Sequence, residues 1–281
     1  MVLFKNPKLK YLIVANDAGA AYQIYYLIKK FNLKCSYYLK GPAKKIFKKK
    51  NIVFLDKEIK KNDVIITGTS LKTDHEKKVI KKCKLYKKKV YSIFDNYNNF
   101  KKRFLLNKKI FYPNIIITID DLSFKEARKY KKKNFLLIKN KDYYLDYIKK
   151  IKKKTLKKNI IYFSSNYDRI SKNPIDLKLF KSFYLKLEKI KLIDNKKNIY
   201  IKIHPSENRN KYLRSQILRN LKIKIVKDLD IVNILKNFEI AGGCETYALA
   251  LAKAFGLKVF NNIENFHIRP KLGRLYKIKK I

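Results

Sequence analysis

Residues 202–207 read Lys-Ile-His-Pro-Ser-Glu, and about forty residues later positions 241–246 read Ala-Gly-Gly-Cys-Glu-Thr. The first stretch is typical of the end of an apolar strand, and the second predicts a glycine turn that enters a helix over 245–255. Glycine lets backbone N–H groups approach an anion closely, and a helix adds its positive N-terminal end. Together the two stretches predict a phosphate site formed by His204, Pro205, Gly242, Gly243, Glu245 and Thr246.

These residues also have purely structural interpretations. His204 could simply end its strand, the two glycines could serve only the turn, and Glu245 could stabilise the helix dipole. A histidine before proline at the end of an Ile-rich strand is an unusual core residue, which favours ligand contact for His204. The helix that follows favours phosphate contact for Gly242 and Gly243. The role of Glu245 stays open.

The chain carries 70 Lys and Arg against 22 Asp and Glu, a formal net charge of +48. Such a charge usually indicates a nucleic-acid or membrane partner. Only eight of the basic residues are Arg, however, and Lys, Ile, Asn, Phe and Tyr are abundant throughout, as expected from an AT-rich genome. Because Arg is favoured for bidentate phosphate recognition, this basic protein is predicted to have a solvated lysine surface rather than a dedicated nucleic-acid site.

Length and composition indicate a globular protein of one large or two modest domains, since 46% of the 281 residues are hydrophobic. The apolar run Tyr11–Ala15 follows several lysines but is too short for a signal peptide. No stretch approaches the ~20 apolar residues of a membrane-spanning helix. We therefore expect a cytoplasmic protein.

Cysteines and histidines give no sign of a metal or cofactor. Cys35, Cys83 and Cys244 lack the spacing of a disulfide framework or a zinc site, so all three are expected to be buried thiols. Surface positions explain His75 and His267 adequately. We predict no metal and no bound cofactor.

The first half of the chain alternates short apolar strands with amphipathic helices. This order predicts a parallel sheet with helices on both faces. Strands are expected over Tyr11–Ala15, Cys35–Leu39, Asp63–Thr67, Val90–Phe94 and Ile115–Ile119, and helices over Ala20–Phe31, Ala43–Lys49 and Thr73–Lys84.

A lysine-rich amphipathic helix over 142–158 predicts a connector between a first domain (1–141) and a second domain (159–281). The second domain repeats the alternation. Its expected strands are Asn159–Phe163, Ile199–Ile203, Lys222–Val226, Glu239–Ala241 and Leu257–Phe260, and its expected helices are Asp176–Ile190, Tyr212–Asn220, Asp230–Lys236 and Glu245–Phe255. The predicted fold class is α/β, with two Rossmann-like parallel-sheet domains facing a cleft.

Ligands of parallel α/β sheets bind outside the carboxyl ends of the strands. This rule places seven residues on the candidate rim: Asn16, Asp17, Gly68, Thr69, Ser70, Asp95 and Asp120. A general base must be a group near the acceptor, so Asp17 and Asp95 are the candidate catalytic residues. Either carboxylate could instead cap a helix or a loop.

The two α/β halves, with a His-Pro strand end and a later Gly-Gly turn in the second, resemble the GT-B class of nucleotide-sugar glycosyltransferases. Residues 202–205 (Lys-x-His-Pro) are similar to the His-Pro motif of bacterial capsule-type sialyl- and Kdo-transferases, which sits at the donor phosphate. Residues 242–246 (Gly-Gly-x-Glu-Thr) are similar to the glycine turn that holds donor phosphates in glycosyltransferases and in nucleotide-sugar 2-epimerases.

Residues 95–104 resemble an Asp-x-aromatic-x-Asn-aromatic-x-x-Arg-Phe segment of polysaccharide-biosynthesis proteins. The acid-acid-Gly motif that carries the general base in sialyl- and Kdo-type enzymes is absent, and residues 16–19 (Asn-Asp-Ala-Gly) only occupy a comparable place. Arg103 could bind an anionic acceptor or pair with Asp95. The acceptor-side residues implied are Asn16, Gly19, Asn99 and Arg103.

The resemblance implies a metal-independent glycosyltransferase. It would transfer a sugar from a nucleotide-sugar donor to a surface polysaccharide or lipid-linked glycan, in peripheral contact with the anionic inner face of the cell membrane. The alternatives are a nucleotide-sugar 2-epimerase-like or non-catalytic sugar-nucleotide-binding protein, and a basic nucleic-acid-binding protein. An epimerase is expected to carry more acids and a longer C-terminal segment, and a nucleic-acid binder is expected to cluster aromatic and Arg residues on one element.

Overall fold

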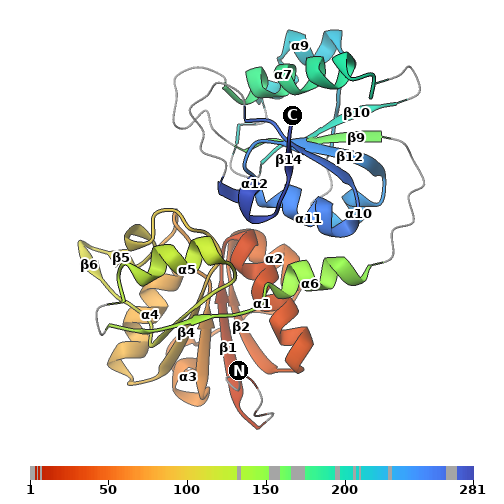
Figure 1. Cartoon of the computed structure of the whole chain (residues 1–281). Coiled ribbons are helices and arrows are strands. Elements are labelled where there is room, and N and C mark those ends of the chain that lie inside the picture. Colours follow the sequence, from red (N-terminus) through yellow and green to blue (C-terminus); the bar gives the residue numbers. More distant parts are fainter. Residues whose placement is uncertain are drawn as a thin grey trace. The chain divides into compact units, whose positions relative to one another are not determined.

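Short buried strands form the centre of each half of the chain. The computed structural model describes residues 4, 6, 8–131, 134–151, 159–165, 175–193, 197–204, 207–208, 210–226, 230–263 and 271–281. The chain divides into two units, residues 1–147 and 148–281. Each unit contains a parallel sheet of six strands with associated helices, so the predicted α/β class with two Rossmann-like sheets is confirmed (Figure 1).

The first sheet has the strand order β2-β1-β3-β4-β7-β8, and every neighbouring pair is parallel. The chain leaves β1 in one direction to form β2 and then crosses to the other side to form β3. The strands are β1 (Lys10–Ala15), β2 (Lys34–Leu39), β3 (Val64–Thr67), β4 (Lys89–Phe94), β7 (Ile115–Thr118) and β8 (Leu136–Lys139).

Alternate side chains of β1 enter two different cores. Tyr11, Ile13 and Ala15 lie in the cluster that contains the buried face of α1, whereas Leu12 and Val14 lie in the cluster that contains the buried face of α4. A strand buried on both faces has an unbroken apolar sequence, and helices must cover both sides of the sheet. The unbroken apolar sequence of β1 therefore indicates a strand that is covered by helices on both faces of the sheet.

The sequence did not predict the helices α3 and α5, the short helix η1, the β5–β6 hairpin or the edge strand β8. Predicted helices were found at α1, α2 and α4 with small changes of their ends. The helices are α1 (Ala18–Phe31), α2 (Gly41–Phe47), α3 (Leu55–Lys61), α4 (His75–Leu85), α5 (Asp121–Arg128) and α6 (Tyr143–Lys150), with a short 3-10 helix η1 (Lys101–Arg103) before β5 (Leu105–Leu106) and β6 (Lys109–Ile110).

Helix α6 corresponds to the beginning of the predicted connector, and residues 152–158 of that connector lie outside the described residues. Its Tyr144 ring stacks between Tyr22 and Tyr26 of α1, at centroid distances of 4.6 and 5.0 Å. Asp142, just before α6, accepts a 2.7 Å hydrogen bond from Gln23 of α1. The start of α6 is thus packed against the first unit.

The second sheet has the order β11-β10-β9-β12-β13-β14, again with every neighbouring pair parallel. This is the strand order of a Rossmann sheet. Successive strands are added on one side of β9 as far as β11 and then on its other side from β12 onward. The strands are β9 (Asn159–Phe163), β10 (Ile199–Lys202), β11 (Lys224–Ile225), β12 (Phe238–Gly243), β13 (Lys258–Asn261) and β14 (Lys279–Lys280).

Two helix predictions in the second unit were wrong in detail. The helix expected over Tyr212–Asn220 is divided at Ser215, whose extended backbone and side chain form the N-cap of α9. The helix expected from Glu245 begins two residues later, because Thr246 is its N-cap. The helices are α7 (Ile175–Lys189), α8 (Asn210–Leu213), α9 (Gln216–Asn220), α10 (Ile231–Leu235), α11 (Tyr247–Phe255) and α12 (Lys271–Leu275).

The expected Gly242-Gly243 turn is also corrected, because both glycines are the last residues of β12. A Cβ atom on Gly242 would lie 2.2 Å from the Phe183 ring, and one on Gly243 would lie 2.8 Å from the Phe163 carbonyl oxygen. Both positions therefore need glycine for close packing. The turn itself is formed by residues 244–246, where Glu245 has a φ of 46°.

The packing of Gly242 gives a direct test of this part of the fold. Gly242→Ala should lower the free energy of unfolding by about 1–3 kcal/mol, because the added methyl group overlaps the Phe183 ring. In a double-mutant cycle, Phe183→Leu should cost less stability in the Gly242→Ala background than in the wild type. Urea denaturation measures both, and strictly additive effects would contradict the contact.

Candidate functional site

The two sheets each have one point at which the strand order reverses, between β1 and β3 in the first unit and between β9 and β12 in the second. Ligands of open α/β sheets bind outside the carboxyl ends of the strands at such points. Most of the predicted site residues that the structure describes lie just after β1, β4, β10 or β12. Gly242 and Gly243 are the last two residues of β12. Each unit therefore has its own candidate site.

In the first unit, Asp95 and Gly19 lie together although they are far apart in the sequence. A Cβ atom on Gly19 would lie only 2.0 Å from Asp95 Oδ2, so the carboxylate occupies the space that a side chain would need. Gly19 lies in the first turn of α1, a helix of 14 residues. The missing side chain lets the Asp95 carboxylate reach the positive end of this helix.

Asp95 is half-buried, and its charge is destabilised in the folded protein. Burial raises the pKa of Asp95 to about 6, with Arg103 opposing the shift and the carboxylates of Asp17 and Asp120 adding to it. A carboxyl group with a pKa near neutrality can exchange a proton at physiological pH. Asp95 is therefore the predicted rim carboxylate best suited to acid–base chemistry.

Arg103 is buried and holds two loops together. Its Nε donates to the Asn98 carbonyl oxygen at 3.0 Å, and a terminal nitrogen donates to the Thr69 carbonyl oxygen at 2.5 Å. These contacts link the loop after β3 to the loop after β4, which carries Asp95. The positive charge of Arg103 opposes the raised pKa of Asp95, and the hydrogen bonds of Arg103 favour a positioning role.

Glu76 was not predicted as a site residue, yet it is almost fully buried beneath the same rim. Its Oε1 accepts hydrogen bonds from the Asn16 backbone N–H at 2.9 Å and from the Ser70 hydroxyl at 2.7 Å. Its Oε2 is one of the buried polar atoms that have no hydrogen-bond partner in the described part of the chain. Burial raises the pKa of Glu76 to about 7, opposed by the Ser70 hydrogen bond.

The sequence signal for Glu76 is weak. A glutamate in the first turn of a helix usually stabilises the helix dipole from the surface. In the folded chain, a Cβ atom on Gly68 would lie 3.2 Å from Glu76 Oε1, but the sequence does not reveal this proximity. The carboxylate can therefore be recognised only once the strands are assembled.

The other predicted first-unit residues have local roles. Asn16 donates a 2.7 Å hydrogen bond to the Asp17 carboxylate, and Asp17 occupies the N-cap position of α1 without a side-chain hydrogen bond to the helix. Asn99 is exposed and has a φ of 59°, a conformation that asparagine adopts readily. Asp120 caps α5 by accepting a hydrogen bond from the Ser123 backbone N–H.

The surface position expected for His75 was wrong. His75 is buried, its Nε2 lies 3.0 Å from the Tyr38 carbonyl oxygen, and burial lowers its pKa. Cys83 and Cys244 are buried as expected, whereas Cys35 is half-buried. His267 lies outside the described residues.

In the second unit, the carboxylate of Glu207 organises the loop after β10. Its Oε2 accepts hydrogen bonds from the Ser164 hydroxyl and, at 3.0 Å, from the His204 backbone N–H. Its Oε1 accepts from the Tyr212 hydroxyl and the Lys211 ammonium group, both at 2.6 Å. Burial alone would raise the pKa of Glu207, but hydrogen bonds from Lys211, Ser164 and Tyr212 outweigh it and lower the pKa.

This network fixes the backbone at His204, while the His204 side chain is exposed at the carboxyl end of β10. Pro205 lies outside the described residues. Glu207 was not predicted as a site residue, although it completes the quoted stretch of residues 202–207. The available signal in the sequence was an acidic residue three positions after the histidine.

Glu245 holds the C-terminal part of the second unit together. Its carboxylate accepts hydrogen bonds from the Leu272 backbone N–H at 2.6 Å, the Gly273 backbone N–H at 3.1 Å and the Asn261 side-chain amide. Asn261 also accepts a 3.0 Å hydrogen bond from the Glu245 backbone N–H. Both carboxylate oxygens are thus occupied by protein donors, which favours the structural interpretation of Glu245.

Beside this clamp a pocket of about 290 Å³ opens next to α12 and β14. Asn261 and Gly273 line it, together with the basic side chains of Arg274, Lys277 and Lys280. At the switch point itself, the Ser165 hydroxyl donates to the Cys244 carbonyl oxygen at 2.5 Å. The rim of the second sheet therefore combines hydroxyl groups, a helix N-terminus and nearby positive charge.

Among the described residues, no group of three or more His, Cys, Asp and Glu side chains is arranged to hold a metal ion. Within the same parts of the chain, no helix is both long enough and apolar enough to cross a membrane.

No protein-family model and no curated protein matches the chain. Solved structures share its fold. The UDP-GlcNAc 2-epimerase of Methanocaldococcus jannaschii, in complex with UDP-GlcNAc and UDP, has a TM-score of 0.63 at 13% identity, covering 97% of this chain and 89% of that chain. The S. aureus MnaA–UDP structure has a TM-score of 0.59 at 11% identity, covering 91% and 80%.

An α/β-galactoside α-2,3-sialyltransferase of Photobacterium phosphoreum has a TM-score of 0.53 at 12% identity, covering 98% of this chain and 99% of that chain. At such identities the likeness concerns the fold alone. The chain therefore has the two-domain GT-B-like fold that these nucleotide-sugar enzymes share.

The raised pKa of Glu76 makes stability depend on pH. The pKa is about 7 in the folded protein against an ordinary value of 4.5, so the folded state binds this proton more tightly than the unfolded state. The free energy of unfolding should therefore fall as the pH rises from about 4.5 through about 7. Glu76→Gln keeps an acceptor oxygen but cannot ionise, so between pH 5 and pH 8 it should lose roughly 2–3 kcal/mol less than the wild type.

Chemical denaturation at the two pH values measures this difference. The matched control is Asp121→Asn, since Asp121 is an exposed acid of the same unit. It should follow the wild-type pH profile. Equal losses in Glu76→Gln and the wild type would show that the Glu76 carboxyl is not held in an unfavourable charged state.

Proposed function

We propose that the protein is a glycosyltransferase that uses a nucleotide-sugar donor and a hydroxyl group of a glycan as acceptor. The second unit would bind the donor phosphates at the carboxyl ends of β9, β10 and β12. The first unit would supply the general base. This division follows the chemistry, since the leaving phosphate needs positive charge and hydrogen-bond donors, and the attacking hydroxyl needs a carboxylate.

Asp95 is the observation that carries the proposal. Its carboxylate lies at the carboxyl end of β4, against the start of α1, and has a pKa of about 6. A general base works best when its pKa lies near the operating pH. Asp17 remains the second candidate, because it lies on the same rim and contributes to the raised pKa of Asp95.

The support on the phosphate side comes from His204 and from the start of α11. His204 is exposed, and its backbone N–H is held by Ser164 and Glu207, so its position at the end of β10 is fixed. Thr246 caps α11, a helix of nine residues that follows the turn of residues 244–246 at the end of β12. Such a helix start favours a phosphate group through its N–H groups and its dipole.

A nucleotide-sugar 2-epimerase is the second candidate function. The specific observation in its favour is the TM-score of 0.63 with an epimerase, against 0.53 with the sialyltransferase. Both reactions need a sugar nucleotide and an acid–base carboxylate. Incubation with a nucleotide sugar alone separates them, since an epimerase converts its substrate without an acceptor.

Nucleotide binding is the first test. In high salt, which suppresses indiscriminate lysine binding, one of CMP, CDP, UDP or GDP should raise the melting temperature selectively. His204→Ala should reduce this shift, because it removes a group that contacts the phosphate. The matched control is Lys178→Ala, which removes an exposed cation from α7 and should leave the shift unchanged. No shift with any nucleotide would refute the proposal.

Once a donor is identified, Asp95 can be tested by kinetics. Asp95→Asn should lower kcat by about 10²–10⁴-fold, with little effect on donor affinity, because it removes the proton acceptor. The wild-type rate should rise with pH through a midpoint near 6, where the carboxyl group ionises. Asp17→Asn is the matched comparison, and full activity of Asp95→Asn would assign the base elsewhere.

A further inference from the structure

Two large apolar side chains project into solvent on the first unit. Val53 is 79% exposed and Phe54 is 70% exposed, and they are adjacent in the loop between α2 and α3. Isolated exposed apolar residues are common and need no explanation. An adjacent pair at such exposure, in a loop that is otherwise anchored, indicates that the two side chains are available to contact another surface.

The loop is held firmly on both sides of the pair. The Asn51 side chain makes two 2.8 Å hydrogen bonds to the backbone of Leu39, one to its N–H and one to its carbonyl oxygen. The next residue, Ile52, donates its backbone N–H to the Tyr37 carbonyl oxygen at 2.8 Å. These bonds attach the loop to β2, the edge strand of the sheet, and leave Val53 with its neighbour on the outside.

Phe54 also has a fixed backbone, because it is the N-cap residue of α3 and its carbonyl oxygen accepts from the Glu58 backbone N–H at 3.1 Å. The Cα–Cβ bond of Phe54 therefore leaves the helix start in a fixed direction. A displayed aromatic residue at a fixed helix end is typical of a contact surface.

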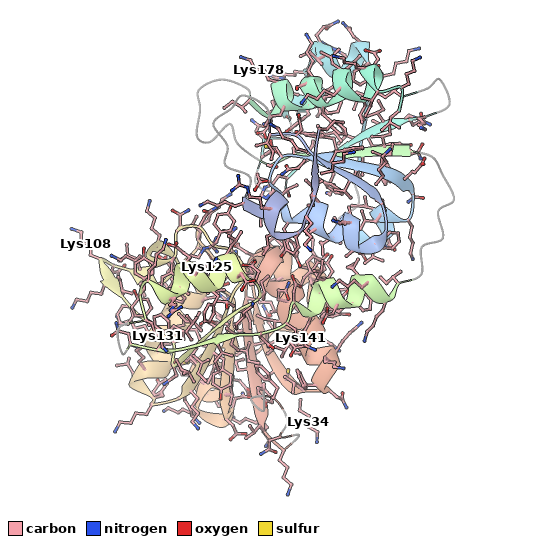
Figure 2. All side chains as sticks on the ribbon, in the orientation of Figure 1. Lys34, Lys108, Lys125, Lys131, Lys141 and Lys178 are labelled. Carbon is pink, nitrogen blue, oxygen red and sulfur yellow. The ribbon has the colours of Figure 1, made fainter. Side chains whose placement is uncertain are left out.

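Exposed lysines surround the apolar pair. Lys48, Lys49 and Lys50 precede it, and Lys57, Lys60 and Lys61 follow it on α3. The two acids of α3 are already paired, Asp56 with Lys82 at 2.8 Å and Glu58 with Lys61 at 3.8 Å. Lysines elsewhere are spread over both units, as Lys34, Lys108 and Lys178 in Figure 2 illustrate. The particular feature of this loop is the apolar pair inside a cluster of cations.

We propose that residues 48–61 form a membrane-docking tip, which inserts Val53 and Phe54 into the interfacial region of an anionic lipid bilayer. Lysines gain energy near anionic headgroups, and apolar side chains gain it by leaving water at the acyl boundary. A bilayer fits better than a protein partner, because two side chains offer far less than the roughly 1,000 Å² of a specific interface and lysine is depleted in such interfaces. The proposal does not depend on the nature of the reaction.

The chain contains no tryptophan, so a single introduced tryptophan reports its own surroundings. With vesicles of phosphatidylglycerol and phosphatidylcholine in about 0.15 M salt, Phe54→Trp should show a blue-shifted emission and quenching by brominated lipid. The matched reporter is Leu136→Trp, because Leu136 is 51% exposed on β8 at the opposite edge of the same sheet. Its emission should stay at the wavelength seen without vesicles. An unshifted Phe54→Trp on vesicle-bound protein would overturn the proposal.

Vesicle flotation separates insertion from attraction by the net charge of +48. The double variant Val53→Ser/Phe54→Ser keeps every charge and should partition at least about tenfold more weakly than the wild type, whereas Leu136→Ser should stay within about twofold. Equal partitioning of all three proteins would mean that charge alone attaches the protein. Loss of a protein dimer in the double variant, with unchanged flotation, would assign the pair to self-association and also overturn the proposal.

Discussion

The burial of carboxylates at the ends of two parallel sheets is the constraint on which both candidate sites depend. A buried carboxylate is costly unless protein donors replace its water. Glu207 and Glu245 meet this condition, since hydrogen bonds from protein groups reach both oxygens of each. Glu76 and Asp95 are less well compensated, and their pKa values are raised to about 7 and about 6. The first pair therefore stabilises the local structure, whereas the second pair keeps its protons more tightly in the folded protein.

The same distinction explains the arrangement of charge in the first unit. The chain has about three basic residues for every acidic one, yet the Asp17 carboxylate contributes to the raised pKa of both Glu76 and Asp95 at one rim. The positive charge of Arg103 partly offsets this negative charge, but Arg103 donates its hydrogen bonds to carbonyl oxygens of the neighbouring loops. The rim is thereby made rigid while its carboxylates keep their high proton affinity. Rigid placement of such groups is what catalysis requires.

The sequence predicted every strand of the two six-stranded sheets except the edge strands β8 and β14, because a strand buried on both faces needs an unbroken apolar run such as Tyr11–Ala15. It failed for α3 and α5, whose short sequences contain too few turns for a clear helical period. It also failed at Ser215, because serine inside an amphipathic pattern can either continue a helix or cap a new one. These elements are decided by local capping and by packing.

The positions of the predicted residues in the fold could be inferred from the sequence, whereas their contacts could not. Gly19 and Asp95 were both chosen individually, but only the folded chain brings them together. Gly242 and Gly243 were interpreted as a turn, whereas packing against Phe183 and the β9 backbone explains both within β12. Glu76 and Glu207 were missed for the same reason, since their importance depends on donors from distant segments.

The central claim is that the second unit binds the donor phosphates and the first unit supplies the carboxylates. Backbone amide NMR of the whole chain, titrated in high salt with the nucleotide that stabilises it, tests this most directly. We expect shifts confined to the carboxyl-end rim of the second sheet, including Ser165, His204 and residues 244–246, with the signals around Asp95 unchanged by nucleotide alone. Shifts centred on the loops after β1 and β4 would contradict the division of labour.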